Sequence, residues 1–345
     1  MSRFIQIHTL TAYPPANLNR DDLGRPKTAM MGGVERLRVS SQSLKRHWRT
    51  SDVFQEALRG HLGTRTKDIG EHVQNSLLAK GVSEKKAEEW AFAIAGVFGK
   101  VEKGKVTTQQ LVFISPGEWQ AVDELASTLA EENRKPSDDE LKSLLKKSTA
   151  VDIALFGRML ADSSNFNVEA ACQVAHAISV HGVTVEDDYF TAVDDLNADH
   201  DDRGAAHIGE TGFASAVFYS YVCIERASLL EKLGGDESLV DKAVGALLEA
   251  IATVSPKGKQ NSFGSHAYAS YMMVEKGNKQ PRSLSAAFLS PIKGDDYLRS
   301  AVEALETQVD HFDTVYGPCA DQRMSFNAAK GEGSLPSVIE MATKV

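Results

Sequence analysis

Hydrophobic and polar positions alternate near the start of the chain and again some twenty residues later. Residues 3–10 and 34–39 both follow the two-residue period of a half-buried strand. The stretch between them, residues 11–33, is rich in proline, glycine, asparagine and charged side chains. Long polar connections of this kind are often functional. We therefore expect two strands joined by a long exposed loop.

The next segment, residues 39–49, has the period of an amphipathic helix. At about 100° per residue, its polar and basic side chains share one face, which comprises Gln42, Lys45, Arg46 and Arg49. Leu44 and Trp48 fall on the opposite face, and Ser40 or Ser41 can cap the N-terminus. A capped helix end beside a basic stripe can bind phosphate and follow a polyanion. The same pattern also fits an ordinary solvated surface helix.

The remaining pattern predicts an α+β fold. Residues 52–148 are mostly helical and highly charged, which indicates an inserted helical subdomain. We then expect a strand at 151–159, an amphipathic helix at 168–180, two strands around an acidic tip within 189–223, a helix at 240–254, a strand at 267–274 and a last helix at 295–315. This order favours an antiparallel sheet with helices on one face, as in RRM-like or ferredoxin-like cores. We place the sheet domain at 1–58 and 149–345, and the insertion at 59–148.

Charge is distributed unevenly along the chain. Overall, 47 Asp and Glu exceed 38 Lys and Arg, yet residues 1–50 carry nine basic and three acidic side chains, a net charge of +6. Residues 183–210 carry nine acids and one arginine, a net charge of −8. A basic and an acidic segment on one chain predict polyanion binding and head-to-tail contact between copies. An acidic surface loop that contacts nothing also fits the second segment.

Familiar catalytic and metal-binding motifs are absent. The sequence has no Walker loop, GxSxG, HExxH or EF-hand loop, and its three cysteines lie far apart. We therefore expect no catalytic residue, metal site or cofactor. No apolar run approaches a membrane span and the N-terminus is unlike a signal peptide, so a cytoplasmic protein without membrane contact is expected.

Two short polar motifs keep a chemical interpretation open. The pair Asp21 and Asp22 can act as a general base or metal pair, although paired loop acids also serve solvation or capping. Lys257, Lys259 and Gln260 lie in a polar turn whose lysines and backbone N–H groups can hold a phosphate. Exposed turns often have this composition as well.

Beyond these patterns, the chain resembles the CasC family, the backbone subunit of the type I-E CRISPR Cascade complex. The most specific matches are the runs Ser-Ser-Gln-Ser-Leu-Lys-Arg at 40–46 and Phe-Thr-Ala-Val-Asp-Asp at 190–195. Other matches follow in family order at 4–8, 18–22, 32–39, 151–159, 175–178, 206–209 and 259–260. Together they extend over about three quarters of the chain.

The resemblance implies a molecule shaped like a right hand. It comprises an RRM-like palm with an antiparallel sheet, helical fingers formed by the insertion, and a thumb hairpin at 183–212. It implies contacts to the RNA backbone from Arg20, Lys27, Ser40, Gln42, Lys45, Arg46 and Arg49. Met159 and Phe190 are implied as apolar wedges at a kinked nucleotide, beside Thr191 and beside Tyr189, which replaces the family's usual tryptophan.

The implied function is that of a non-catalytic scaffold. Several copies would line up head-to-tail along one CRISPR RNA, with the target DNA strand and subunits of the CasA, CasB, CasD and CasE types as further partners. One alternative is a related backbone subunit that cleaves target RNA with Asp21 or Asp22. Another is a stand-alone RNA-binding protein.

Overall fold

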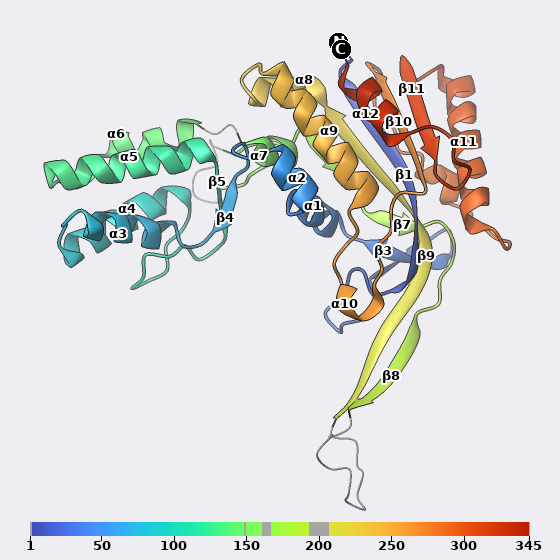
Figure 1. Ribbon diagram of the computed structural model, residues 1–345, viewed down its shortest axis with the longest axis horizontal. Coiled ribbons are helices and arrows are strands. Elements are labelled where there is room, and N and C mark those ends of the chain that lie inside the picture. Colours follow the sequence, from blue (N-terminus) through green and yellow to red (C-terminus); the bar gives the residue numbers. More distant parts are fainter. Residues whose placement is uncertain (1, 148–149, 161–166, 193–206, 345) are drawn as a thin grey trace, which may run out of the picture. The chain divides into compact units, whose positions relative to one another are not determined.

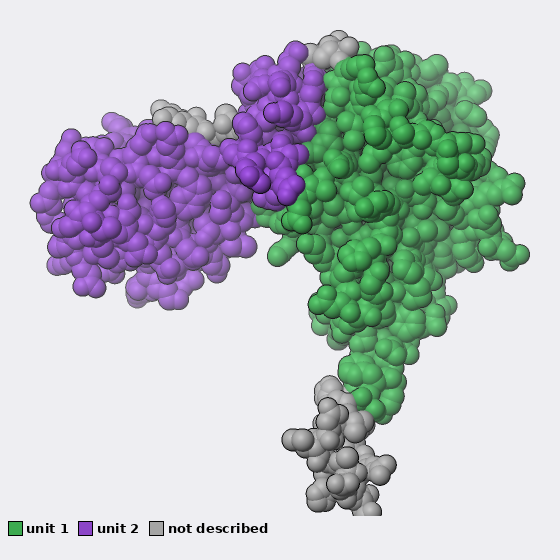
Figure 2. Space-filling view, viewed as in Figure 1, with its two compact units in different colours: residues 1–54, 174–223, 244–345 green, residues 55–173, 224–243 purple. Residues whose placement is uncertain are grey.

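The computed structural model describes residues 2–147, 150–160, 167–192 and 207–344 (Figure 1). The chain forms two compact units, coloured green and purple in Figure 2. Unit 1 comprises Met1–Phe54, Val174–Cys223 and Val244–Val345, and unit 2 comprises Gln55–Gln173 and Ile224–Ala243. The helical insertion expected at 59–148 lies within unit 2. Residues 150–160 and 167–173, which we assigned to the sheet domain, also belong to unit 2.

A large antiparallel sheet forms the centre of unit 1. Its strand order is β11-β10-β1-β9-β7-β3-β2, and β6 and β8 pair with β9. The pairs β1–β10, β10–β11, β2–β3, β3–β7, β7–β9 and β8–β9 are all antiparallel. The strands are β1 (Phe4–Ala16), β2 (Thr28–Met31), β3 (Val34–Val39), β6 (Cys172–Val174), β7 (Ala177–Ser179), β8 (Glu186–Ala192), β9 (His207–Glu225), β10 (Tyr271–Gly277) and β11 (Gln322–Asn327). The predicted α+β class with an antiparallel sheet is confirmed.

Helices cover both faces of this sheet, whereas the sequence pattern predicted only one. On one face, Tyr271 and Met273 of β10 pack in a buried cluster with Leu305 of α11 (Tyr297–Tyr316). On the other, the Nζ atom of Lys276 donates to backbone carbonyls near the end of α12 (Leu335–Thr343). Helix α9 (Glu237–Thr253) packs beside α12, since Gly245 lies against Ile339 (Figure 1). The other short helices here are α1 (Ser41–Arg49), α2 (Asp52–Ala57), α10 (Gln260–Phe263) and η3 (Ser285–Phe288).

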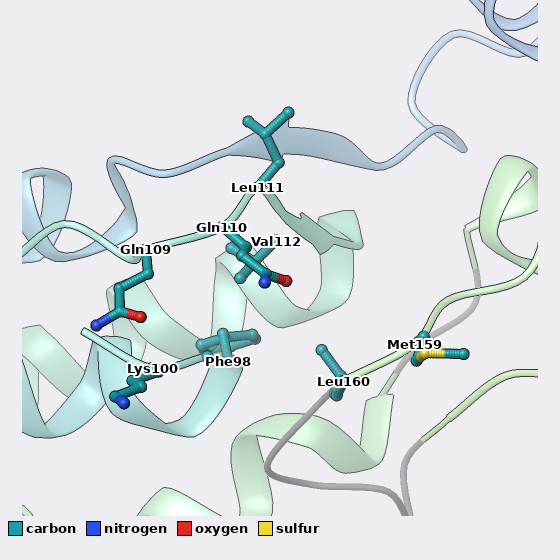
Figure 3. A pocket seen from close by; sticks show the side chains of 9 residues that line it. Phe98, Lys100, Gln109, Gln110, Leu111, Val112, Met159 and Leu160 are labelled. Atoms are coloured by element: carbon teal, nitrogen blue, oxygen red, sulfur yellow. The ribbon is translucent and has the colours of Figure 1, made fainter. Parts of the chain in front are cut away.

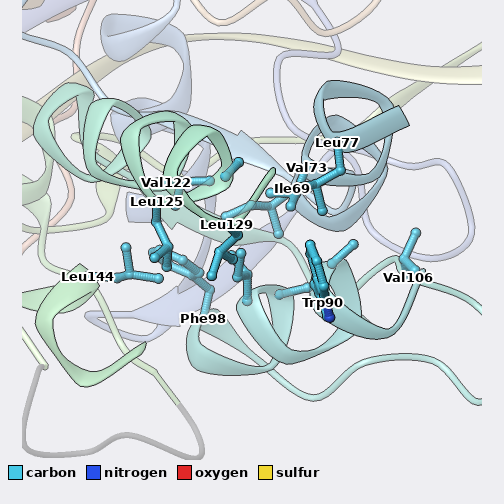
Figure 4. Packing of buried hydrophobic residues seen from close by; sticks show 14 of the residues in the cluster. Ile69, Val73, Leu77, Trp90, Phe98, Val106, Val122, Leu125, Leu129 and Leu144 are labelled. Carbon is cyan, nitrogen blue, oxygen red and sulfur yellow. The ribbon is translucent and has the colours of Figure 1, made fainter. Parts of the chain in front are cut away.

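Unit 2 is mainly helical. Helices α3 (Ile69–Ala79), α4 (Glu84–Phe98) and α5 (Pro116–Glu132) enclose a core that includes Trp90, Phe98 and Leu129 (Figure 4). The capping boxes of Ser115 with Glu118 and of Ser137 with Glu140 start α5 and α6 (Asp138–Ser143). The other elements are β4 (Thr64–Thr66), β5 (Val112–Ile114), η1 (Leu144–Lys147), α7 (Val151–Phe156) and α8 (Arg226–Lys232). Among the described residues, no helix has the length and apolar character to cross a membrane.

Two predicted elements are wrong, and two elements at the end of the chain were not predicted. The strand expected at 151–159 is the short helix α7, which ends at Gly157 with φ of +80°. The helix expected at 168–180 is instead β6 and β7, because residues there pair with β9 and β3. Helix α11 matches the predicted segment 295–315 but is followed by β11 and α12.

Candidate nucleic-acid interface

The basic helix α1 has the two faces that its sequence predicts. Leu44 and Trp48 are buried, whereas Gln42 and Arg46 are exposed and Lys45 and Arg49 are half-buried. Ser40 is the N-cap: its Oγ accepts a hydrogen bond from the backbone N–H of Ser43 at 3.3 Å. The backbone N–H of Ser40 donates to Oδ1 of Asn19 at 2.8 Å, which fixes the helix start to the preceding loop. Ser40 itself is buried in this capping role.

The loop between β1 and β2 is folded tightly around two polar side chains. Oδ1 of Asp21 accepts from the backbone N–H groups of Leu23 at 3.0 Å and of Arg25 at 2.9 Å. The buried amide of Asn17 donates to the carbonyls of Gly24 and Gly212, both at 2.9 Å. These bonds hold the loop against the base of the β8–β9 hairpin, while the side chain of Arg20 stays exposed.

The turn at 257–260 is fixed against the same loop by a close backbone approach. A Cβ atom at Gly258 would lie 2.3 Å from the carbonyl oxygen of Leu18 and 2.5 Å from that of Asn17, so only glycine fits. Lys259 adopts the left-handed conformation with φ of +49°, which is uncommon for a side-chain-bearing residue. Strain of this kind clusters at functional sites. The turn thereby places Lys257 beside α1 and its preceding loop.

These three segments enclose an open polar groove of about 620 Å³. Its lining residues are Leu18, Asn19, Arg20, Asp21, Asp22, Gly24, Ser43, His47, Lys257 and Gly258. A second hollow of about 280 Å³ shares Arg20 and Gly24 with the first and extends to the hairpin base, where Lys259, Asp187 and Glu210 line it. The structure thus brings together Arg20, Lys257 and the helix α1, which the sequence had indicated separately.

Two histidines lie near basic side chains of this surface. The pKa of His47 is lowered by burial and by the nearby charges of Lys257 and Arg46. The pKa of His176 is also lowered, first by burial and then by the nearby cations Arg38, Lys27 and Lys45. Nη1 of Arg38 lies 3.0 Å from Nδ1 of His176. Cations from the loop, from β3 and from α1 therefore gather around these rings. The sequence interpretation that placed His176 on a helix is wrong, because it lies between β6 and β7.

One arginine in the basic N-terminal segment is structural. The guanidinium of Arg36 is buried and donates to the carbonyls of Met31 at 3.2 Å, Ser179 at 2.9 Å and Phe288 at 2.9 Å. Burial lowers its pKa. The count of nine basic residues within 1–50 therefore overstates the charge that this segment presents at the surface.

The predicted pair of strands within 183–212 is present as the β8–β9 hairpin (Figure 1). Tyr189 stands opposite Glu210 and Phe190 opposite Gly209. The side chains of Tyr189 and Phe190 are 65% and 43% exposed, and Thr191 is exposed. An ion pair of 3.0 Å between Arg25 and Asp187 joins the hairpin base to the β1–β2 loop. The predicted acidic tip at 197–204, and also Asp194 and Asp195, lie outside the described residues.

Met159 lies in unit 2 and is 86% exposed, the most exposed large apolar side chain among those described. It stands between two buried neighbours, Arg158 and Leu160. Nη1 of Arg158 donates to Glu118 at 2.7 Å and to the carbonyl of Phe113 at 3.0 Å, and this anchors the segment. Met159 and Leu160 line a small hollow of about 150 Å³ together with Phe98, Lys100, Gln109, Gln110 and Leu111 (Figure 3). Met159 and Phe190 belong to different units, so their pairing at one nucleotide stays a prediction.

Sequence reasoning missed several residues that build or line the groove. Asn17 and Asn19 organise the loop and the start of α1 through their amides. His47 lines the groove from α1, and its position directly after Arg46 was the only signal for it. Gln260, which the sequence did indicate, begins α10, and its side chain Oε1 accepts from Ser265 Oγ at 2.9 Å. Within the described ranges, no three His, Cys, Asp or Glu side chains are grouped so that they could hold a metal ion.

Comparison with known proteins relates the chain to CRISPR complexes. A chain of a "CRISPR RNA-guided surveillance complex, pre-nicking" is 31% identical, with 99% of each chain covered and a TM-score of 0.84. A chain of a second "CRISPR RNA-guided surveillance complex" is 26% identical, again with 99% of each chain covered, and has a TM-score of 0.74. A comparison with curated protein sequences found no match. The model of the CT1975-like protein family matches residues 5–341, so the chain belongs to that family.

Proposed function

We propose that this chain is a non-catalytic, crRNA-binding backbone subunit of a type I-E Cascade surveillance complex. One observation carries the proposal: basic side chains from two distant segments line one open groove together with α1. Arg20 comes from the β1–β2 loop and Lys257 from the turn before α10, while α1 contributes Ser43 and His47 to the lining and carries the basic stripe of Lys45, Arg46 and Arg49. Such a surface suits a phosphate backbone, because it offers cations beside the N-terminus of a helix.

In this proposal the two units and the hairpin have different tasks. The sheet unit acts as an RRM-like palm, the helical unit as fingers and the β8–β9 hairpin as a thumb. Arg20, Lys27, Gln42, Lys45, Arg46, Arg49, Lys257, Lys259 and Gln260 follow the RNA backbone. Ser40 contributes by capping α1. Exposed Tyr189, Phe190, Thr191 and Met159 are available to pack against a displaced nucleotide.

Several copies then bind one guide RNA head-to-tail in the cytoplasm, together with the other Cascade subunits. Base pairing between the guide and the target DNA strand supplies sequence specificity, and the protein supplies backbone contacts and shape. The local charges support this arrangement, because the basic segment 1–50 of one copy complements the acidic segment 183–210 of the next.

The role of Asp21 supports a scaffold over a nuclease. Its Oδ1 accepts two backbone hydrogen bonds within the turn 21–25, which is the capping role of a loop acid. Asp22 lines the groove and is exposed. A general base needs to reach the reacting hydroxyl, and a carboxylate that organises its own loop is less suited to that task.

Fluorescence anisotropy with labelled single-stranded RNA tests this function. Lys257→Ala should weaken binding to RNAs of unrelated sequence by similar factors and reduce the salt dependence. Lys330→Ala removes an exposed lysine between β11 and α12 and serves as the matched control, with affinity unchanged. Equal effects of both variants, or no binding by the wild type, would contradict the proposed function.

A further inference from the structure

The imidazole of His47 is held in one tautomer. Its Nδ1 lies 2.7 Å from the backbone carbonyl oxygen of Ser43, one turn earlier in α1. A carbonyl oxygen can only accept, so Nδ1 carries the proton and donates it. Within the described residues, Nε2 has no hydrogen-bond partner in the protein. The neutral ring therefore offers the Nε2 lone pair as an acceptor.

The surroundings of His47 favour this neutral form. Burial is the largest cause of its lowered pKa, and the charges of Lys257 and Arg46 add to it. The other charged groups that line the same groove are Arg20, Asp21 and Asp22, and Asp21 is engaged by the backbone of its own turn. At neutral pH the ring is thus an uncharged acceptor in a groove that Arg20 and Lys257 line together with the carboxylates of Asp21 and Asp22.

A nucleic-acid backbone has few groups that can donate a hydrogen bond to Nε2 of His47. Phosphate oxygens only accept hydrogen bonds, so they match Arg20 and Lys257 and are repelled by the Nε2 lone pair. The ribose 2′-hydroxyl is a donor that RNA has and DNA lacks. Building on the proposed function, we propose that Nε2 of His47 accepts a hydrogen bond from a ribose 2′-hydroxyl. This contact makes the groove prefer RNA to DNA of the same sequence.

The test compares labelled RNA and single-stranded DNA of one sequence at pH 8, with the full chain. His47→Ala should weaken RNA binding about two- to tenfold, the range for one net hydrogen bond, and leave DNA binding unchanged. His47→Gln should restore part of the RNA affinity, since its amide oxygen is again an acceptor. Lys257→Ala should weaken both ligands by similar factors. Circular dichroism melting of each variant checks that it is folded.

Acidification supplies a second readout. When pH falls through the lowered pKa of His47, Nε2 gains a proton and becomes a donor. The ratio of RNA to DNA affinity should therefore fall towards acid pH in the wild type and stay flat in His47→Ala. Equal loss of RNA and DNA affinity in His47→Ala would overturn the inference in favour of a phosphate contact. No loss at all would overturn it too, and if Lys257→Ala still weakened both ligands, the proposed function would stand. Binding of neither nucleic acid by the wild type would overturn both.

Discussion

The ring of Phe190 on β8 covers Gly209, its cross-strand partner on β9. A Cβ atom at residue 209 would lie 2.3 Å from Cζ of Phe190 and 2.7 Å from Cε2, so the ring fills the space of the absent side chain. An aromatic ring over a strand glycine compensates for the packing that glycine lacks. Phe190 thus packs on the hairpin itself, with 43% of its surface exposed.

Phe190→Ala should show whether Phe190 contacts a displaced nucleotide or stabilises the folded core. We expect the melting temperature of the free chain to stay nearly unchanged, because 43% of the surface of Phe190 is exposed. RNA or target engagement should weaken by about 1–3 kcal/mol for each base that no longer stacks on the ring. The matched control is Phe218→Ala, which removes a buried ring and should destabilise the fold by about 3–5 kcal/mol. A large fall in melting temperature for Phe190→Ala, with RNA affinity retained, would show that it is a core residue.

Lys45→Ala should weaken binding to the RNA backbone without changing the sequence preference of the protein. Unrelated guides should lose affinity by similar factors, and the slope of log affinity against log salt should become shallower by about 0.7 for each phosphate that is no longer neutralised. The same is expected of Arg46→Ala and Arg49→Ala. A titration over several salt concentrations measures this slope. A loss confined to one guide sequence would argue for base recognition instead.

The two loop aspartates should behave differently. Asp21→Ala removes the acceptor of two backbone hydrogen bonds and should destabilise the loop by about 1–3 kcal/mol, whereas Asp21→Asn keeps an acceptor oxygen and should lose less. Asp22→Ala should leave stability and RNA binding nearly unchanged. Target RNA incubated with the wild type, with or without magnesium, should stay intact on a gel. Metal-dependent cuts at regular intervals that Asp22→Ala abolishes would establish the nuclease alternative.

The buried ion pair of Arg158 and Glu118 should be the strongest polar contact in unit 2. Arg158→Ala leaves a buried carboxylate without its partner, and we expect a loss of about 3–5 kcal/mol in thermal or urea unfolding. Arg299→Ala breaks an exposed pair with Glu303 on α11 and should have little effect. If both substitutions cost equally little, Arg158 does not anchor the segment that carries Met159.

The elements that could be predicted from the sequence are those determined by side chains close together along the chain. The faces and cap of α1 follow from side chains within one or two turns. Helix α7 was missed because its short, apolar-rich sequence fits either period, and Oδ1 of Asp152 is fixed by a distant partner, the backbone N–H of Gly63 at 2.8 Å. Strands β6 and β7 are short and depend on pairing with β9, which no local pattern reveals.

The site was predictable in its parts but not in its assembly. Arg20 and Lys257 have suitable chemistry in the sequence, yet their meeting depends on Gly258 lying against the carbonyl of Leu18. The sequence also offers no sign that Arg36 is buried by three backbone carbonyls, since its neighbours Glu35 and Arg38 are charged.

The mass of the RNA complex as a function of guide length tests the central claim most directly. Mass photometry of the wild-type chain with RNAs of increasing length should show a stepwise rise, with one further copy bound for each fixed increment of RNA. This stepwise growth follows if each copy binds a short segment of the RNA backbone and contacts the next copy through its β8–β9 hairpin. A single copy at every length, or no complex at all, would contradict the backbone-subunit account.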